Sequence, residues 1–249
     1  MNRFDGVKVL LTGAASGIGR ATALRLTAEG AAVFGVDVSE EGLAATAAAV
    51  TGPGRLVTGV ADVTDEAAVV AATDRAAAAL GGIDVLINVA GVHRATPIAT
   101  LSVADLQHLF SVNLVGTALF CREALRYLPD GSGVIVNVAS LSATQGNPYM
   151  TAYSASKGAV LAFSLSLAAE LTARRIRVVP VSPGTVDTPL TRRPDVVPQG
   201  VDLSYFNRIR APFGSAEPEQ IASVIAFAAS RDASYLTGAE LRVDGGAHI

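Results

Sequence analysis

The chain has 249 residues and a net charge of −3, and only 16% of its residues are charged, against about 25% in typical soluble domains. This length suffices for one domain with a large core, and the absence of a basic cluster argues against a nucleic-acid partner. No apolar run reaches the roughly 18 residues that a membrane-spanning helix needs, so we expect no membrane partner. The N-terminus has no apolar signal segment and Cys121 is the only cysteine, which indicates a cytoplasmic protein.

Short β-branched runs alternate with longer alanine-rich stretches along the whole chain. The runs predict strands at 7–11, 33–38, 56–60, 85–89, 133–138, 176–181 and 240–243, and the stretches between them predict helices at 17–29, 40–50, 65–80, two within 102–128, 153–174 and 217–229. This alternation is typical of parallel strands joined by helical crossovers. We therefore expect an α/β fold with a single Rossmann-type doubly wound sheet over residues 1–249. The long irregular segment 184–215 is expected to form a lid over a substrate.

The first predicted strand leads into a glycine-rich turn, TGAASGIG, at residues 12–19. Its glycines, Gly13, Gly17 and Gly19, would let a dinucleotide diphosphate approach the amides at the start of the following helix. The spacing G-x-x-x-G-x-G differs from the common dinucleotide fingerprint, and glycine is frequent in such turns. Its position between the first strand and the first helix is what favours a dinucleotide site.

Asp37 ends the second predicted strand, 18 residues after Gly19. A carboxylate at this place can accept hydrogen bonds from the adenosine ribose hydroxyls and would repel a 2′-phosphate. No arginine flanks it, so the sequence favours NAD over NADP. Capping of the next helix is better assigned to Ser39.

The pair Tyr153 and Lys157 has a helical i, i+4 spacing, and Lys157 is one of only two lysines in the chain. On a helix both side chains would lie on one face. An ammonium beside a phenol is expected to lower the phenol pKa from about 10. The spacing thus suggests a proton-transfer group that works near neutral pH, although a surface Tyr and Lys would have the same spacing.

Taken together, these motifs resemble those of the short-chain dehydrogenase/reductase family over nearly the whole chain. The resemblance implies catalytic residues Asn113, Ser140, Tyr153 and Lys157. It implies cofactor contacts from Gly13, Ser16, Gly17, Ile18, Gly19, Asp37, Asp62, Val63, Asn88, Ala90, Gly91, Tyr153, Lys157, Pro183, Gly184, Val186 and Thr188. One departure is Val89, which stands where the family has a second asparagine with a structural role. Ser142 could be mistaken for the catalytic serine, but the family uses the serine that ends the fifth strand, here Ser140.

The resemblance implies an oxidoreductase that exchanges a hydride between NAD(H) and a secondary alcohol or ketone, with Tyr153 as general base or acid. In the family, Ser140 would hold the substrate oxygen, Lys157 would also bind the nicotinamide ribose, and Asn113 would position a water that links Lys157 to solvent. The alternatives are an NADPH-linked 3-oxoacyl thioester reductase and a catalytically silent dinucleotide-binding sensor or scaffold.

The sequence does not select the substrate, which we expect to be a small molecule. Ser142, Asn147 and Tyr149 are candidate substrate contacts, and His93 and Arg94 could reach the mouth of the cleft. A solvated surface role is the simpler interpretation of Arg94. No metal site is predicted. The family is usually tetrameric, and the alanine-rich helix around 159–171 would allow close packing of subunits, so we expect a homotetramer.

Overall fold

One sheet of seven parallel strands forms the centre of the computed structural model, which describes residues 3–192, 201–202, 204–206 and 210–249. The strand order is β3-β2-β1-β4-β5-β6-β7, which confirms the doubly wound architecture expected from the sequence. The strands are β1 Lys8–Thr12, β2 Ala32–Asp37, β3 Arg55–Val60, β4 Val85–Asn88, β5 Val134–Val138, β6 Arg177–Pro183 and β7 Leu241–Val243.

The central strands are buried on both faces, which explains why they are continuous apolar runs in the sequence. Every residue of β4 and β5 is buried. The edge strand β7 has only three residues, none of them fully buried. A short edge strand presents few unpaired backbone groups to other chains.

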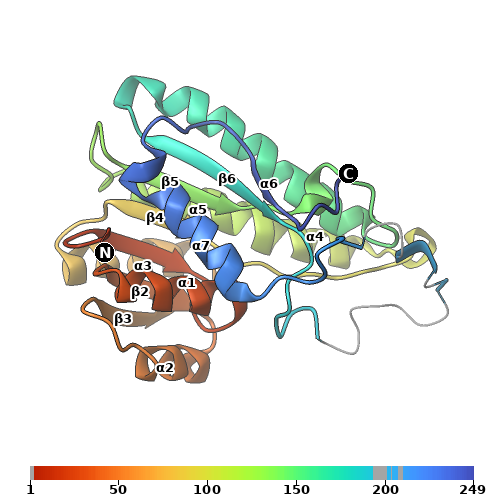
Figure 1. Ribbon diagram of the computed structural model, residues 1–249, viewed down its shortest axis with the longest axis horizontal. Coiled ribbons are helices and arrows are strands. Elements are labelled where there is room, and N and C mark those ends of the chain that lie inside the picture. Colours follow the sequence, from red (N-terminus) through yellow and green to blue (C-terminus); the bar gives the residue numbers. More distant parts are fainter. Residues whose placement is uncertain (1–2, 193–200, 203, 207–209) are drawn as a thin grey trace.

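Helices cover both faces of the sheet (Figure 1). On one face α1 (Gly17–Ala28) and α7 (Pro218–Ala229) pack against each other, and they share a core cluster with Leu43 of α2 (Glu40–Ala48). The other face is covered by α3 (Glu66–Leu80), α5 (Gly116–Ala124) and α6 (Thr151–Glu170), whose buried residues form a second cluster. Seven strands with two helical layers give the core that the apolar composition predicts.

Helix boundaries follow from local capping. Ser39 caps α2 by accepting a hydrogen bond from the Gly42 amide, as expected from the sequence. Asp65 caps α3 at its start, and Gly81 ends it in the left-handed conformation. The helix predicted to end at 174 instead leaves α geometry after Glu170 and continues as a 3₁₀ turn, Leu171–Arg174.

The two helices predicted within 102–128 form one continuous rod with an inserted turn. Helix α4 (Val103–Phe110) passes into a π-helical turn, Ser111–Val115, and then into α5. Such turns occur frequently at functional sites. The π turn holds Asn113, one of the predicted catalytic residues.

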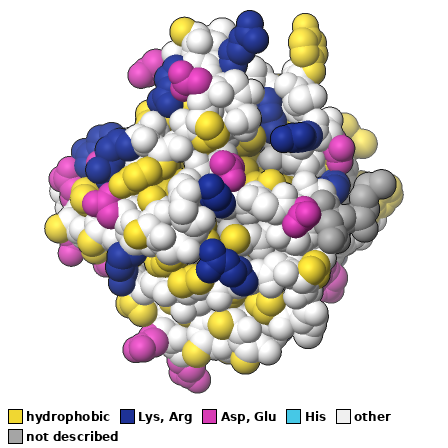
Figure 2. Space-filling model, turned by 90° about the vertical axis from the view of Figure 1, so that its left-hand side faces the viewer, with side chains coloured by type: hydrophobic (Ala, Val, Ile, Leu, Met, Phe, Trp, Pro, Cys, Tyr) yellow, Lys and Arg dark blue, Asp and Glu magenta, His cyan; other side chains and the backbone are white. Residues whose placement is uncertain are grey.

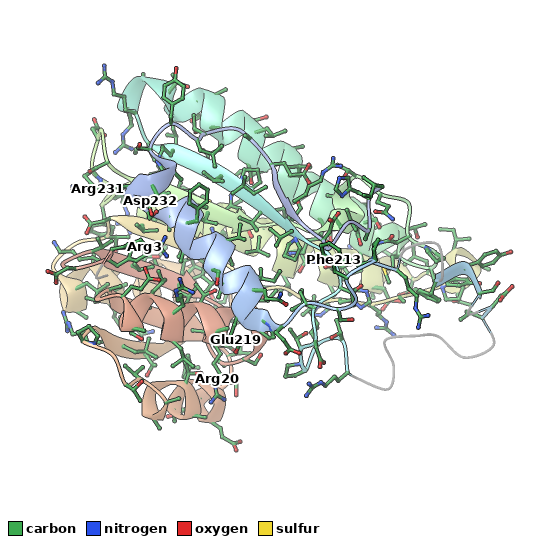
Figure 3. All side chains as sticks on the ribbon, in the orientation of Figure 1. Arg3, Arg20, Phe213, Glu219, Arg231 and Asp232 are labelled. Carbon is green, nitrogen blue, oxygen red and sulfur yellow. The ribbon has the colours of Figure 1, made fainter. Side chains whose placement is uncertain are left out.

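Ion pairs join the start of the chain to residues just beyond α1 and α7. Arg3 donates to Glu29 at 2.6 Å and to Asp232 at 3.2 Å, and the residues labelled Arg3 and Asp232 in Figure 3 come from opposite ends of the sequence. In the part of the chain that the structure describes, no helix has the length and apolar character needed to cross a membrane. Within the predicted lid, residues 193–200, 203 and 207–209 lie outside the described residues.

The sheet reverses its strand order between β1 and β4, which are hydrogen-bonded neighbours. In open parallel sheets, a ligand binds beyond the carboxyl ends of the strands at such a switch point. The glycine-rich turn follows β1 and the Asn88–Gly91 segment follows β4, so both motifs meet at this point.

Candidate active site

The glycine-rich turn is packed tightly at its three glycine positions. A Cβ atom at Gly13 would lie 2.8 Å from the Ala90 amide nitrogen, and one at Gly19 would lie 1.9 Å from the Gly13 carbonyl oxygen. Gly17 has a φ of 49°, and a Cβ there would meet the Thr188 methyl group at 3.2 Å. The turn therefore needs glycine at three places, for close approach and for a left-handed backbone.

Helix α1 begins inside this turn with Ser16 at its N-cap, whose side chain makes no capping hydrogen bond. Its first amides are thus available to an anionic group, as at other helix starts that bind diphosphate. Thr12 completes the turn, because its buried Oγ1 accepts hydrogen bonds from the Val89 and Ala90 amides at 3.1 and 3.2 Å. Among these residues, Thr12 was not predicted as a site residue, although it stands inside the motif.

Asp37 lies at the carboxyl end of β2, beside the glycine-rich turn. Its carboxylate accepts hydrogen bonds from the Ala15 amide and the Ser39 amide, both at 3.1 Å. Val38, the next residue, is 64% exposed, so no cation follows Asp37. Asp62 lies beyond β3 and accepts two hydrogen bonds from Thr64, while Val63 is buried and would contact any side chain added at Gly116. These carboxylates lie where the sequence predicts the adenosine end of a dinucleotide.

Tyr153 and Lys157 occupy one face of α6 and line the same cavity, of about 110 Å³. The Lys157 ammonium donates a hydrogen bond to the Val138 carbonyl at 2.8 Å, at the end of β5. The walls of this cavity are Ile18, Val89, Gly91, Val92, Val138, Ala139, Ser140, Tyr153, Lys157, Pro183, Gly184, Val186, Thr188, Leu190 and Thr191. Helical spacing thus brings the phenol and the ammonium to one site, as predicted.

Burial determines the proton affinity of both groups. It raises the pKa of the Tyr153 phenol above its usual value, and a hydrogen bond with Ser140 opposes that rise. It lowers the pKa of Lys157 to about 8. The Tyr153 pKa is therefore raised, not lowered as the sequence predicts, because burial disfavours the charged phenolate and the Ser140 hydrogen bond offsets only part of this effect.

Ser140 ends β5 and begins a 3₁₀ turn, Leu141–Ala143, in which its Oγ accepts the Ser142 amide at 3.1 Å. Ser140 lines the cavity with Tyr153, while Ser142 instead accepts a hydrogen bond from the Asn147 amide group. The assignment of Ser140 rather than Ser142 to the phenol is thus consistent with the geometry. The buried Oδ1 of Asn147 has no partner among the described residues, which leaves it available to a substrate donor.

Tyr149 adopts a backbone conformation that is rare for a bulky residue, with a φ of 61°. Its carbonyl accepts a hydrogen bond from the Thr96 amide at 2.6 Å, which fixes the loop before α6. Its ring lies 5.9 Å from the Phe206 ring and 6.5 Å from the Tyr205 ring. These contacts join the predicted substrate loop to the predicted lid. Strain of this kind is concentrated at functional sites.

Asn113 is completely buried in the π turn and joins the loop after β4 to α6. Its Oδ1 accepts the Val92 amide at 2.8 Å, and its Nδ2 donates to the Val92 carbonyl and to Ser156 Oγ. A Cβ at Gly91 would lie 3.1 Å from Asn113 Oδ1 and 3.3 Å from the Lys157 nitrogen. Gly91 therefore lies close to both Asn113 and Lys157. The hydrogen bonds of the Asn113 side chain to Val92 fix the loop that follows β4.

Asn88 and Cys121 belong to a buried polar cluster behind the site. Asn88 donates to Asn137 Oδ1 at 2.9 Å and to the Cys121 sulfur at 3.4 Å, and Asn137 donates to Ser164. Burial raises the pKa of the Cys121 thiol to about 12, so this cysteine is an inert core residue. The cluster ties β4 to β5 and α6. The predicted cofactor contact of Asn88 stays a prediction, since its amide group faces this cluster.

His93 and Arg94 have different surroundings. The His93 ring meets the Tyr153 ring edge-on, with 4.6 Å between centroids, so His93 contacts the predicted catalytic phenol. Arg94 instead pairs with Asp105 at 2.6 Å. The sequence indicated that both could reach the cleft mouth. In the structure His93 contacts the predicted catalytic phenol, whereas Arg94 is held by Asp105.

Nine of the predicted residues share the 110 Å³ cavity: Ile18, Gly91, Ser140, Tyr153, Lys157, Pro183, Gly184, Val186 and Thr188. Sequence reasoning missed its apolar walls, chiefly Val92, Val138 and Leu190. Such residues carry no chemical signature, since apolar residues are frequent at strand ends. Their positions next to motif residues were the available signal.

The residues present fit a nicotinamide dinucleotide. Its diphosphate would fit against the backbone at Gly13 and Gly19 and the uncapped start of α1. Its adenosine ribose would fit against Asp37. At the other end, the cavity with Tyr153 and Lys157 matches the nicotinamide and substrate. In the described part of the chain, no group of three or more His, Cys, Asp or Glu side chains could hold a metal ion.

The buried lysine leads to a testable pH dependence. Because the pKa of Lys157 is about 8 in the folded protein and about 10.4 in an unfolded chain, the unfolded state binds more protons between these values. The free energy of unfolding should therefore rise with pH, by about 1.5 kcal/mol between pH 8 and 9.5. Urea unfolding at several pH values measures this. Lys157→Met should abolish the rise. Lys8→Met, which changes the only other lysine, should retain it. A rise that persists in Lys157→Met would contradict the assignment of this pH dependence to Lys157.

The chain is similar to known dehydrogenases and reductases along almost its whole length. A family model described as enoyl-(acyl carrier protein) reductase matches residues 13–248. The chain is 43% identical to the cis-4-hydroxycyclohexanecarboxylate dehydrogenase of Sinomonas cyclohexanicum, over 95% of this chain and 94% of that protein. It is 42% identical to the D-threitol dehydrogenase of Mycolicibacterium smegmatis, over 98% and 94%. It is 37% identical to a 3-oxoacyl-[acyl-carrier-protein] reductase of Thermotoga maritima, over 98% of each.

Solved structures show the same fold. A short-chain dehydrogenase of Mycobacterium paratuberculosis bound to NAD superimposes with a TM-score of 0.93 and 30% identity, over 98% of both chains. One of Burkholderia cenocepacia in complex with NADP gives 0.89 and 33%, over 99% of this chain and all of that one. The match covers almost the whole chain and its relatives are dehydrogenases and reductases of alcohols and ketones. The chain therefore belongs to the short-chain dehydrogenase/reductase family, whose members are nicotinamide-dependent oxidoreductases.

Proposed function

We propose that the protein is an NAD(H)-dependent oxidoreductase for a secondary alcohol or its ketone, with Tyr153 as the proton-transfer group. The observation that carries this proposal is the common cavity of Ser140, Tyr153 and Lys157 beside the glycine-rich turn. When bound, the dinucleotide supplies the hydride acceptor or donor. The protein contributes placement of the substrate and proton handling.

Each residue of the cavity has a distinct proposed role. Tyr153 accepts the hydroxyl proton in oxidation and donates it in reduction. Its raised pKa keeps the phenol protonated near neutral pH, which suits the reductive direction directly. Ser140, which is hydrogen-bonded to the phenol, holds the substrate oxygen. Lys157, with a pKa of about 8, can exchange a proton with solvent near neutral pH. Asn113 fixes the Val92 loop beside it.

NAD is the proposed cofactor rather than NADP. Asp37 supports this preference, because its carboxylate lies beside the glycine-rich turn and would repel a 2′-phosphate. The exposed Val38 beside it supplies no compensating cation. The 3-oxoacyl reductase alternative usually requires NADPH and is disfavoured by the same carboxylate.

Removing the charge of Asp37 should change the cofactor preference. Asp37→Asn is isosteric and should weaken NADH and strengthen NADPH binding, each by about tenfold, which corresponds to about 1.4 kcal/mol. Fluorescence titration of both reduced cofactors measures the two constants. Glu41→Gln, on the exposed side of α2, is the matched control and should leave both unchanged. Equal responses of the two cofactors to Asp37→Asn would refute the role of the carboxylate.

A panel of secondary alcohols with NAD and NADP, followed at 340 nm, tests the proposed function. Turnover with NAD on simple secondary alcohols supports it. Turnover confined to 3-oxoacyl thioesters with NADPH would establish the reductase alternative. No turnover of any alcohol or ketone would support a silent dinucleotide-binding sensor.

We also propose a homotetramer in the cytoplasm that acts on small molecules. Exposed apolar side chains on the α4–α5 rod and α6 support subunit contacts, among them Val103 at 71% and Leu165 at 40% exposure.

The lone Cys121 is buried and unpaired, as in proteins of reducing compartments, which supports the proposed cytoplasmic location. Figure 2 shows cationic and anionic side chains interspersed on the face that it displays, which disfavours nucleic acid as a partner. The segment 184–215 is proposed as a lid within this single domain.

A further inference from the structure

A second cavity, of about 490 Å³, lies beside the catalytic one. Its described walls are Thr185, Phe206, Arg210, Ala211, Pro212, Gly214 and Ser215. Thr185 stands between Gly184 and Val186, which both line the catalytic cavity, so the two cavities share one loop. The neighbouring Phe213, labelled in Figure 3, marks this region. The volume falls in the range of small-molecule sites.

Aromatic contacts also connect this cavity to the catalytic residues. Phe206 lies 5.9 Å from Tyr149, ring to ring, and Tyr149 lies four residues before Tyr153, in the turn that precedes α6. Phe206, Ala211 and Pro212 give an apolar wall, while Thr185 and Ser215 add hydroxyl groups. A substrate whose carbinol carbon lies at Tyr153 could therefore extend its remaining atoms into this cavity.

Arg210 is the charged residue among the described walls of the cavity. Within the described residues, its guanidinium has no carboxylate or hydrogen-bond partner. Other arginines near the site are already paired: Arg94 with Asp105 at 2.6 Å, and Arg192 with Asp187 through two hydrogen bonds, one of 2.6 Å. Of these three arginines, all within the described residues, Arg210 is the one whose donors remain available.

We infer that the substrate is a secondary alcohol or ketone that carries a carboxylate, and that Arg210 binds this carboxylate. This inference rests on the proposed function and adds the class of substrate. A guanidinium offers paired donors that match a carboxylate, and the apolar wall fits a short alkyl or alicyclic body between the two polar ends. Arg94 is not available for this role, because it pairs with Asp105.

Matched substrates that differ only in charge test the inference. We would measure kcat/KM with NAD for 4-hydroxycyclohexanecarboxylate and for the corresponding carboxamide, using wild type, Arg210→Gln, Arg210→Lys and Arg94→Gln. Wild type should prefer the acid. Arg210→Gln should lower kcat/KM for the acid by about 10- to 100-fold and leave the amide within about twofold. Arg210→Lys should recover part of the loss, and Arg94→Gln should behave as wild type.

Inhibition of cyclohexanol oxidation by cyclohexanecarboxylate gives a readout that does not depend on turnover of the acid. Arg210→Gln should raise its inhibition constant by the same factor. Equal losses for acid and amide, or no loss with Arg210→Gln, would overturn the inference while the proposed function stands. Turnover of neutral alcohols with rejection of the acid would do the same. Absence of turnover for every alcohol would instead overturn the proposed function.

Discussion

Tyr153→Phe is expected to lower kcat by about 10²–10⁴-fold, the usual contribution of a general acid or base. The substitution removes one oxygen and retains the ring that meets His93 edge-on and lines the cavity from α6. Folding and dinucleotide binding should therefore be preserved. Steady-state rates at 340 nm, together with NADH titration, separate the loss of chemistry from a loss of binding.

The matched control is Tyr127→Phe, which removes a hydroxyl from a tyrosine outside the site. Tyr127 donates to Asp74 at 2.7 Å on the surface, so its loss should leave kcat within about twofold. If Tyr153→Phe kept near wild-type turnover, proton transfer would have to come from another group in the cavity. His93 would then be the first residue to test, because it contacts the same ring.

Gly19→Ala is expected to abolish high-affinity dinucleotide binding. The added Cβ would lie 1.9 Å from the Gly13 carbonyl oxygen, so the backbone of the turn must move to make room for it. Such overpacking typically costs about 1–3 kcal/mol, and a cost at the upper end of this range corresponds to about 100-fold in the dissociation constant if it falls on binding. NADH titration and thermal unfolding show how the cost is divided between binding and stability.

Gly158→Ala provides the control for this substitution. Gly158 also lies in a helix, but a Cβ there would make only an ordinary contact of 3.4 Å with the Ala143 carbonyl. Alanine has the higher helix propensity, so this variant should be as stable as wild type or slightly more so. Unchanged NADH affinity in Gly19→Ala would mean that the turn tolerates opening, and the cradle would then lose its assigned role.

The fold and the motif residues could be predicted from the sequence because their signals are local. Strands buried on both faces are necessarily apolar runs, and residues 12–19 combine a strand end with a helix start. The Tyr153–Lys157 spacing needs only a helix to place both groups in one cavity. The similarity to known family members confirms the predicted family, fold and oxidoreductase class.

Properties that depend on distant contacts could not be predicted. The direction of the Tyr153 pKa shift follows from burial of the whole cavity rather than from its nearest charge. The pairing of Arg94 with Asp105, the π turn at Asn113 and the approach of Arg210 to the second cavity are set by packing. None of them leaves a periodic signal in the sequence.

The strand order has a consequence for how the protein is made. Residues up to Val60 complete β1, β2 and β3, so the strands that flank Asp37 can pair early during synthesis. The glycine-rich turn, however, packs against Ala90, which follows β4. A nascent chain must therefore insert β4 beside β1, closing a loop of more than 70 residues, before the diphosphate cradle exists. Such non-local pairing is slow, and the dinucleotide can stabilise the chain only after this step.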